Sequence, residues 1–285
     1  MIQKTGVEIN GYKNGLLFRF ENLREFHRAV QHAMDKPRES KTYGRVSELV
    51  SRYKREKSFS GCYFDEALQR KYAYKGGLDK ILKMQGIEVQ LKAAEYRKQW
   101  SEYDGDDMDM DRMYNEQPFL SRRVKVIGAR NRGMFKVYIN VAEPWMENYE
   151  NMMWKTWAAC RICDELENQG HRVEIMLCAL CEACHPGYKY TLTEIVLKRF
   201  EEPFNIALLS TACSPWYFRI WLFILWSFYQ RSNSNLGHPI TAANHYNIND
   251  ENKTAIIIDR GDCLSEERAN NFIRTLDIGS EFDFS

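Results

Sequence analysis

The sequence lacks the long apolar segments that mark membrane and secreted proteins. Its longest apolar run, WYFRIWLFILWSFY at residues 216–229, contains Arg219 and is shorter than the about 20 apolar residues that span a bilayer. We therefore expect a buried helix there and no membrane partner. The opening residues MIQKTGVEINGYKNG are polar and contain no apolar core of a secretion signal. The eight cysteines of such a chain should stay reduced.

Motifs for several kinds of chemistry are also missing. The chain contains neither the Gly-x-Ser-x-Gly turn of hydrolases nor the Gly-x4-Gly-Lys loop of nucleotide-binding proteins, and its six histidines show no metal-ligand spacing. The formal net charge is only +1, so charge-driven binding would need a local patch. These absences predict a protein that is not an enzyme and needs no cofactor.

What is present predicts an α/β fold. Residues 15–20 suit a short strand, and helical spacing of apolar residues follows at 23–34, with further helices expected at 47–53, 64–77 and 77–99. The acidic stretch SEYDGDDMDMD at 101–111 is typical of a linker. We therefore expect two domains, a mainly helical N-terminal region over residues 1–115 and an α/β domain over residues 116–285.

Strands and helices alternate in the second part. RRVKVIGARNRGMFKVYINVA, from residue 122, predicts a strand, a turn at 131–133 and a second strand. A long helix over 146–170, strands at 171–180 and 188–200, helices over 203–229, a strand at 254–259 and a helix capped by Ser265 follow. This alternation predicts a largely parallel sheet with flanking helices.

The order of these elements resembles a von Willebrand factor A-like domain, and the wider layout is similar to a phage-encoded family of unknown function built on that fold. The similar stretches are SFSGCYFDEAL (58–68), DMDRMYNEQPFL (109–120), KVYINVA (136–142) and LKRFEEPFNIALLSTACSPWYFRIWLFILWSF (197–228). The resemblance implies a phage protein in the host cytoplasm or the virion. It also implies a module that recognises a phage or host protein, in some members a ring ATPase.

Metal-binding members of the A-domain group place Asp-x-Ser-x-Ser at the end of their first strand. The corresponding residues here are Asn140, Val141, Ala142, Glu143 and Pro144. One carboxylate and two hydroxyls are missing, whereas a hard divalent cation requires several oxygen ligands. We therefore expect the scaffold of the domain without its metal site.

Two Cys-x-x-Cys pairs, at 160–163 and 178–181, have a spacing close to that of zinc sites. The first pair falls inside the predicted long helix and the second on the strand after it, where neither pair can form the tight turn of a zinc site. Buried free cysteines packing in the core explain most of the pattern better. Cys181, Cys184 and His185, at the exit of the strand, remain as metal-site candidates.

Acidic residues follow several of the predicted strands. In open α/β sheets ligands bind beyond the carboxyl ends of the strands, where loops are also polar for other reasons. The candidates for a ligand site at this edge are Asn140, Glu143, Glu182, Asp259 and Asp262. Such a carboxylate cluster would also serve a metal-dependent enzyme, which is one alternative function.

Basic residues concentrate in the predicted hairpin over 122–136, and no acid occurs from residue 121 to 142. The candidates for contacts with nucleic acid or an acidic partner are Arg122, Arg123, Lys125, Arg130, Arg132 and Lys136. Only Phe135 and Tyr138 offer aromatic rings nearby, and basic residues also protect the edge strands of sheets. The favoured function is therefore a non-enzymatic binding or scaffold protein, with nucleic-acid interaction as the alternative.

Overall fold

The computed structural model of the chain describes residues 2–9, 12–35, 41–71, 79, 81, 83–84, 96–101, 107–115, 117–125, 133–183, 187–229, 238–246 and 254–276. The chain divides into two compact units. The first comprises residues 1–84 and 132–285, and the second comprises residues 85–131, inserted between them. These units differ from the predicted division at residues 115 and 116, because the insertion begins before that position and ends after it.

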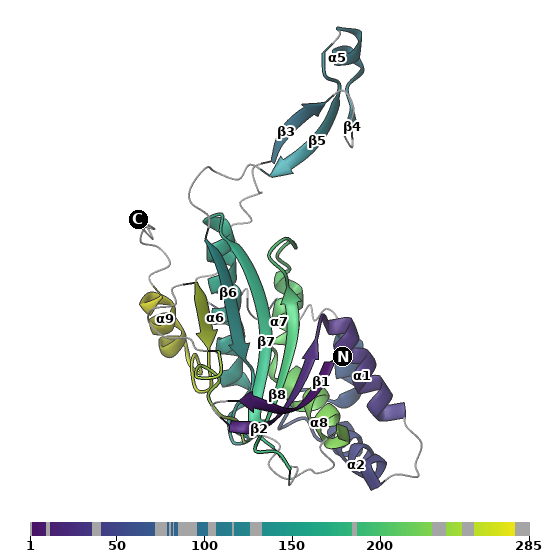
Figure 1. Cartoon of the computed structure of the whole chain (residues 1–285), viewed down its shortest axis with the longest axis vertical. Helices are drawn as coiled ribbons and strands as arrows, with labels where there is room; N and C mark the ends of the chain where they lie inside the picture. The colour runs from purple at the N-terminus through teal and green to yellow at the C-terminus, as the bar shows by residue number, and fades with distance from the viewer. Residues whose placement is uncertain are drawn as a thin grey trace. The chain divides into compact units, whose positions relative to one another are not determined.

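The first unit is an α/β fold around a six-stranded mixed sheet with the order β1-β2-β8-β7-β6-β9 (Figure 1). Its strands are β1 (Ile2–Ile9), β2 (Tyr12–Phe20), β6 (Met134–Asn140), β7 (Arg172–Glu182), β8 (Tyr190–Lys198) and β9 (Ala255–Ile258). The pairs β2–β8, β6–β7 and β6–β9 are parallel, whereas β1–β2 and β7–β8 are antiparallel. The prediction of a largely parallel sheet is therefore not confirmed. Residues 183–189 are too few for the crossover that a parallel β7–β8 pair would need.

The predicted helical N-terminal region is also not confirmed. β1 pairs antiparallel with β2, and this pair extends the main sheet through the parallel pairing of β2 with β8. The helices α1 (Leu23–Asp35), α2 (Lys41–Arg55) and α3 (Phe64–Arg70) follow. The sequence does not predict β1, because its polar residues break the apolar alternation by which strands are recognised.

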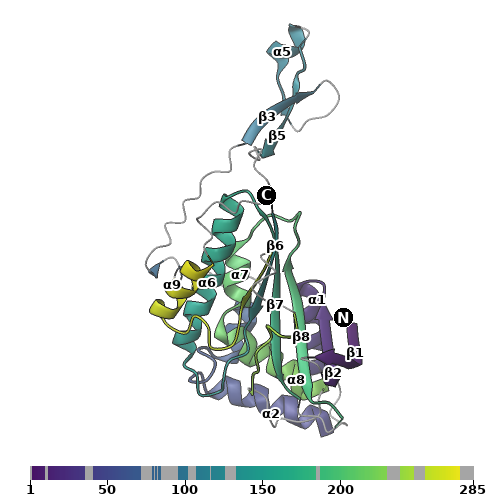
Figure 2. The same ribbon diagram turned by 60° about the vertical axis from the view of Figure 1, so that its left-hand side comes forward.

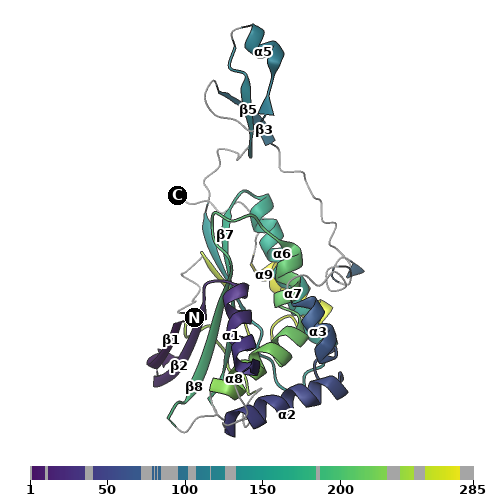
Figure 3. The ribbon, with the colours of Figure 1, turned by 90° about the vertical axis from the view of Figure 1, so that its right-hand side faces the viewer.

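Helices cover one face of the sheet, as Figure 3 shows for α1, α6, α7 and α8. The later helices are α6 (Tyr149–Asn168), α7 (Ile206–Ala212), the π-helix η1 (Tyr217–Leu222), α8 (Phe223–Tyr229) and α9 (Glu266–Thr275), which lies beside α6 (Figure 2). On β7 and β8, Cys178, Leu180 and Leu192 pack with Ala242 and Ile240 of the segment 238–246. The central strands are therefore covered on both faces.

The long helix α6 agrees with the predicted helix over 146–170. It begins after Asn148, whose side chain accepts a hydrogen bond from the Glu150 N–H, and it ends before Gly170, which has a φ of 87°. The buried face of α6 includes Met153, Trp157 and Cys160. This apolar face holds the helix against the sheet.

Within the described residues, no single helix has the length and apolar composition to cross a membrane. The pair formed by Ile206–Ala212 and Tyr217–Tyr229 has that length and composition when taken together, but it is bent by 51°.

The second unit contains a three-stranded antiparallel sheet with the order β3-β5-β4. Its elements are β3 (Tyr96–Ser101), β4 (Asp107–Met108), α5 (Met110–Tyr114) and β5 (Leu120–Lys125). The predicted hairpin over 122–136 is wrong, because β5 pairs with β3 and β4 whereas β6 lies between β7 and β9. Buried Phe135, Val137 and Ile139 alternate along β6 with more exposed residues, which suits a strand with one face packed on the core. The prediction of a helix over residues 77–99 is wrong for residues 96–99, because they belong to β3.

Candidate functional site

The carboxyl ends of β6 and β9 bring two predicted residues side by side. Ile139 pairs with Ile258, so the next residues, Asn140 and Asp259, are neighbours at the sheet edge. The Asn140 amide Nδ2 donates to Asp259 Oδ1 at 2.8 Å and to the Ile240 carbonyl oxygen at 3.1 Å. Asn140 is completely buried, so its side chain joins β9 and the segment 238–246 to the end of β6.

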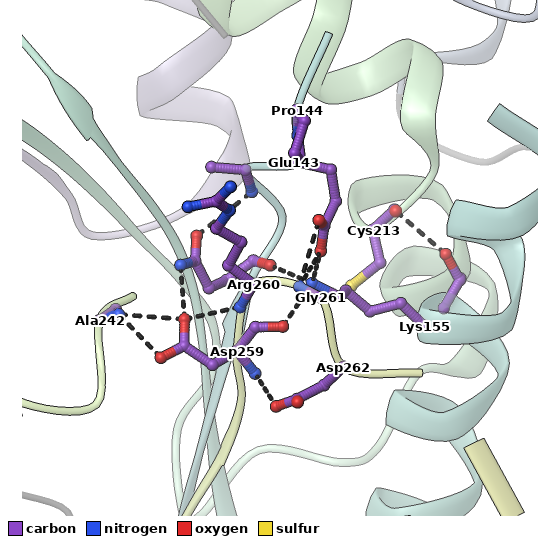
Figure 4. Close-up of polar contacts among 12 residues, drawn as sticks. Glu143, Pro144, Lys155, Cys213, Ala242, Asp259, Arg260, Gly261 and Asp262 are labelled. Carbon is purple, nitrogen blue, oxygen red and sulfur yellow. Dashed lines mark hydrogen bonds and ion pairs between the residues drawn. The ribbon is translucent and has the colours of Figure 1, made fainter. Parts of the chain in front are cut away.

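A lysine from α6 lies at the centre of this edge (Figure 4). The buried Lys155 Nζ donates to the carbonyl oxygens of Asn140, at 2.8 Å, and Asp259, at 2.7 Å, and to the carboxylate of Glu143. An ammonium has three donor hydrogens, and each finds an acceptor here. Lys155 therefore joins the ends of two strands to the helix that crosses behind them.

The Glu143 carboxylate also accepts hydrogen bonds from a backbone N–H group. The Gly261 N–H donates to its two oxygens at 3.1 and 3.2 Å. Gly261 has a φ of 80°, a left-handed conformation that glycine adopts without steric cost. Glu143 is fully buried, so the ion pair with Lys155 and this backbone donor replace its water shell.

The Asp259 carboxylate organises the loops beyond the sheet (Figure 4). Besides the Asn140 amide, it accepts hydrogen bonds from the backbone N–H groups of Ala242, Ala243 and Arg260 at 2.7–3.0 Å. The Asp259 N–H donates in turn to Asp262 Oδ2 at 2.8 Å, and burial raises the pKa of the Asp262 carboxyl. The carboxylates of this network are thus engaged by donors of the protein itself.

The residues at this edge do not fit a divalent cation of the A-domain type. Asn140 points its amide nitrogen toward Asp259, and Ala142 and Pro144 offer no side-chain oxygen at the two hydroxyl positions. The Lys155 ammonium contacts the Glu143 carboxylate and the carbonyl oxygens of Asn140 and Asp259. Backbone N–H groups donate to the carboxylates of Asp259, Asp262 and Glu143. Across the part of the chain that the structure describes, no three His, Cys, Asp or Glu side chains are grouped so that they could hold a metal ion.

The turn that follows Glu143 exposes two large apolar side chains. The Glu147 N–H donates to the Pro144 carbonyl oxygen at 2.9 Å, so residues 144–147 form a tight turn with Trp145 and Met146 at its tip. Trp145 is 59% exposed and Met146 is 75% exposed. Such exposure of a tryptophan next to a fully buried network distinguishes this turn from ordinary surface.

A buried arginine donates hydrogen bonds to the backbone of this turn, which we call the Trp145 turn (residues 144–147). Arg219 of η1 donates through Nη2 to the carbonyl oxygens of Pro144, at 3.1 Å, and Glu147, at 2.7 Å. Its Nη1 donates to the Phe59 carbonyl oxygen, and its guanidinium lies 4.5 Å from the centre of the Phe59 ring. Burial lowers the pKa of Arg219 to about 10, so it remains charged at neutral pH.

The remaining predicted residues of the sheet edge and of the cysteine motif lie apart from this network. Glu182, at the end of β7, is about half exposed and lies 4.0 Å from the His238 ring. The cysteines at 160, 163, 178 and 181 are buried and form no disulfide, and their burial agrees with the core-packing interpretation. Burial raises the pKa of the Cys160 and Cys163 thiols well above their usual value. Cys184 and His185 lie outside the described residues.

The predicted basic residues belong to different units. Arg122, Arg123 and Lys125 lie on β5 of the second unit, whereas Lys136 lies on β6 of the first and forms an ion pair with Glu174 at 3.4 Å. Arg130 and Arg132 lie outside the described residues. β5 and β6 therefore do not form one hairpin.

The residues that sequence reasoning missed are Lys155 and the Trp145 turn. The signal for Lys155 was a single charge among the buried positions of a helix, next to Met152 and Thr156. The signal for Arg219 is a charge within an apolar run, because a buried arginine requires partners such as the carbonyl groups it contacts.

Comparison with known proteins finds no match among curated proteins and none among solved structures. One family model, described as a domain of unknown function (DUF7192), matches residues 5–281. Because this match covers nearly the whole chain, the chain belongs to that family of unknown function.

Proposed function

We propose that this chain is a non-enzymatic phage binding or scaffold protein whose A-like domain lacks a metal site and recognises a protein partner. The strand order β8-β7-β6-β9 corresponds to the 3-2-1-4 part of a doubly wound sheet, which supports an A-like arrangement of these four strands. A long helix directly after β6 and a capped helix after β9 add to this support.

The observation that carries the proposal is the Trp145 turn. Tryptophan and methionine are enriched at protein interfaces, and tryptophan is among the residues that contribute most to binding energy. Arg219 fixes both ends of the turn, so little conformational entropy is lost when a partner binds its tip. The partner would offer an apolar pocket for the indole ring.

The buried Lys155 defines the chemistry of the same edge. Its ammonium supplies a positive charge among oxygens of both strand ends, in the position where A-domains use a cation. Recognition at this edge therefore requires no metal ion. The engagement of Glu143 and Asp259 by protein donors favours a binding surface over the alternative of a metal-dependent enzyme.

The resemblance indicates which kind of partner to expect. The proposed partner is a phage or host protein, for example a ring ATPase. The proposed location is the host cytoplasm or the virion, where reduced thiols agree with seven buried cysteines that form no disulfide among the described residues.

The test compares the wild type and two variants, each expressed in infected cells as the tagged full chain. The variant Trp145→Ser with Met146→Ser removes the exposed side chains of the turn. The control Met134→Ser removes a side chain of similar exposure, 50%, at the opposite end of β6. Captured proteins are quantified for each form, with and without a chelator.

We expect a partner whose recovery falls about tenfold or more with the double variant and is unchanged by the control variant and by the chelator, as for a binding hot spot. Equal recovery of every captured protein by all three forms would overturn the proposal. Loss of recovery with the chelator alone would overturn its metal-independent part.

A further inference from the structure

The two long strands of the inserted unit are rich in basic residues and contain no acid. β3 includes Arg97 and Lys98, and β5 includes Arg122, Arg123 and Lys125. The segment 101–111 between them contains only acidic charges. Charge is therefore segregated within the unit, although the protein as a whole has a net charge of only +1.

β3 and β5 form a two-stranded ribbon, and their register determines which of these residues share a face of it. In an antiparallel pair, directly opposite residues belong to the same face, and successive residues alternate between faces. The pairs Tyr96–Lys125, Lys98–Arg123 and Trp100–Ser121 therefore share one face, which we call the aromatic face. Arg97, Gln99 and Arg122 belong to the other face.

The aromatic face combines two kinds of group in a regular order. Tyr96 and Trp100 are four residues apart on β3, roughly 13 Å along the strand, with Lys98 midway between them. Arg123 and Lys125 stand opposite Lys98 and Tyr96. Among the described residues, one acid shares this face, Asp107 of β4, which pairs with Ser121 on the side of β5 away from β3.

We propose that the aromatic face of the β3–β5 ribbon binds single-stranded nucleic acid. Cations neutralise phosphates, and aromatic rings stack on bases, which is the combination that proteins use for single strands. An acidic protein would be served by the cations alone and would not require rings on both sides of them. This function is separate from the partner recognition proposed for the Trp145 turn.

The test measures binding of a fluorescent 20-nucleotide mixed-sequence oligonucleotide, as DNA and as RNA, to the full-length protein by anisotropy over a salt series. The first variant is Lys98→Gln with Arg123→Gln, on the aromatic face. The matched control is Arg97→Gln with Arg122→Gln, which removes the same number of charges from the same two strands. A third variant, Trp100→Ala, leaves every charge in place.

We expect the Lys98 and Arg123 variant to weaken binding at least about tenfold and to reduce the slope of log K against log salt by about 1.4, since each lost phosphate contact removes about 0.7. The control should weaken binding less than about threefold. Trp100→Ala should weaken binding about tenfold with an unchanged slope, because stacking releases no counterions.

Three outcomes would overturn the proposal. They are no binding at about 50 mM salt, equal losses for the two paired-charge variants, and equal binding of polyglutamate with no effect of Trp100→Ala, which would point to an acidic protein instead. Circular dichroism and thermal unfolding of each variant ensure that a loss reflects the surface. If Lys98→Gln with Arg123→Gln does not fold, the single change Lys125→Gln on the same face takes its place, with about half the change in slope.

Discussion

At the scale of single residues, Lys155 is the most informative position of the molecule. Its ammonium is buried together with the carboxylate of Glu143, and both are removed from water. A buried ion pair adds little to stability relative to apolar residues, but removal of one partner leaves an uncompensated charge. The pair therefore specifies where α6 and the strand ends must meet.

We predict that Lys155→Met lowers the free energy of unfolding by about 3–5 kcal/mol, because Glu143 would remain buried without its counter-charge. The double variant Lys155→Met with Glu143→Gln should lose less than the sum of the two single changes. Urea unfolding followed by tryptophan fluorescence measures these values.

The matched control for this prediction is Lys136→Met. Lys136 also forms an ion pair, with Glu174, but half of its side chain is exposed, so its loss should cost at most about 1 kcal/mol. If Lys155→Met and Lys136→Met had equal effects, the buried pair would not have the structural role described.

His27 gives the molecule a pH-dependent stability. Its Nε2 lies 3.0 Å from both the Lys71 carbonyl oxygen and the Tyr217 hydroxyl, and burial lowers the pKa of His27 from 6.5 to about 4. The unfolded chain therefore takes up this proton first as the pH falls. The stability that His27 contributes is complete above pH 6.5 and is lost as the pH falls toward 4.

We predict that His27→Gln makes the protein less sensitive to acid. Between pH 7 and pH 4.5 the wild type should lose about 2 kcal/mol more stability than the variant, an amount that follows from the shifted pKa. Urea unfolding at a series of pH values tests this, and the difference between the two proteins removes the contributions of the other histidines. Parallel pH curves would contradict the prediction.

Part of the edge network could be predicted at this scale. Their positions after strands predict Asn140, Glu143, Asp259 and Asp262 as site residues, and the structure places them within one network. Lys155 could not be chosen in this way, because its partners are 12 to 104 residues away along the chain. Glu182 satisfied the same rule but lies outside the network, because a position after a strand does not specify which loop folds back over it.

At the scale of elements, the helix α6 explains the cysteine pattern. Cys160 and Cys163 are both fully buried on this helix, and Cys178 and Cys181 are buried on the next strand. The pattern that resembles a zinc motif therefore reflects small residues packed between a helix and a sheet.

We predict that the seven described cysteines react with a thiol reagent only when the protein unfolds, because burial shields them all. Burial also raises the pKa values of six of these thiols, which are Cys62, Cys160, Cys163, Cys178, Cys213 and Cys263. The measurement uses a Cys184→Ser variant, so that only these thiols are counted. Native protein should show almost no fast reaction, whereas protein in denaturant should show complete reaction. Rapid labelling of two or more thiols in the native state would contradict the packing described for α6 and β7.

Element type could be predicted from the sequence better than element pairing. The predicted strand at 254–259 and the long helix over 146–170 correspond to β9 and α6, because their periodicity reflects local burial. The pairing of β5 with β3 could not be predicted from the sequence, because the turn signal at residues 131–133 favours pairing of β5 with β6, the next strand along the chain. The opposite direction of β8 was predictable in principle, since so short a loop favours a hairpin.

At the scale of the whole molecule, the chain builds one sheet from distant segments and inserts a small unit between them. Residues of β2 pair with residues of β8 about 175 positions later. No local pattern specifies such a pairing, so the sequence alone predicts a separate N-terminal region. The carboxyl edge and the ribbon of the insertion would then be two binding surfaces carried by separate units.

We predict that the first unit folds without the insertion. In a variant whose residues 85–131 are replaced by a flexible Gly-Ser linker of about 20 residues, cooperative thermal unfolding should persist within about 5 °C of the wild type, because the six-stranded sheet and the helices packed on it lie entirely in the first unit. The same variant should lose oligonucleotide binding and keep the partner that depends on Trp145. Loss of cooperative unfolding would show that the insertion contributes to the core of the first unit, and retained oligonucleotide binding would move the nucleic-acid site away from the β3–β5 ribbon.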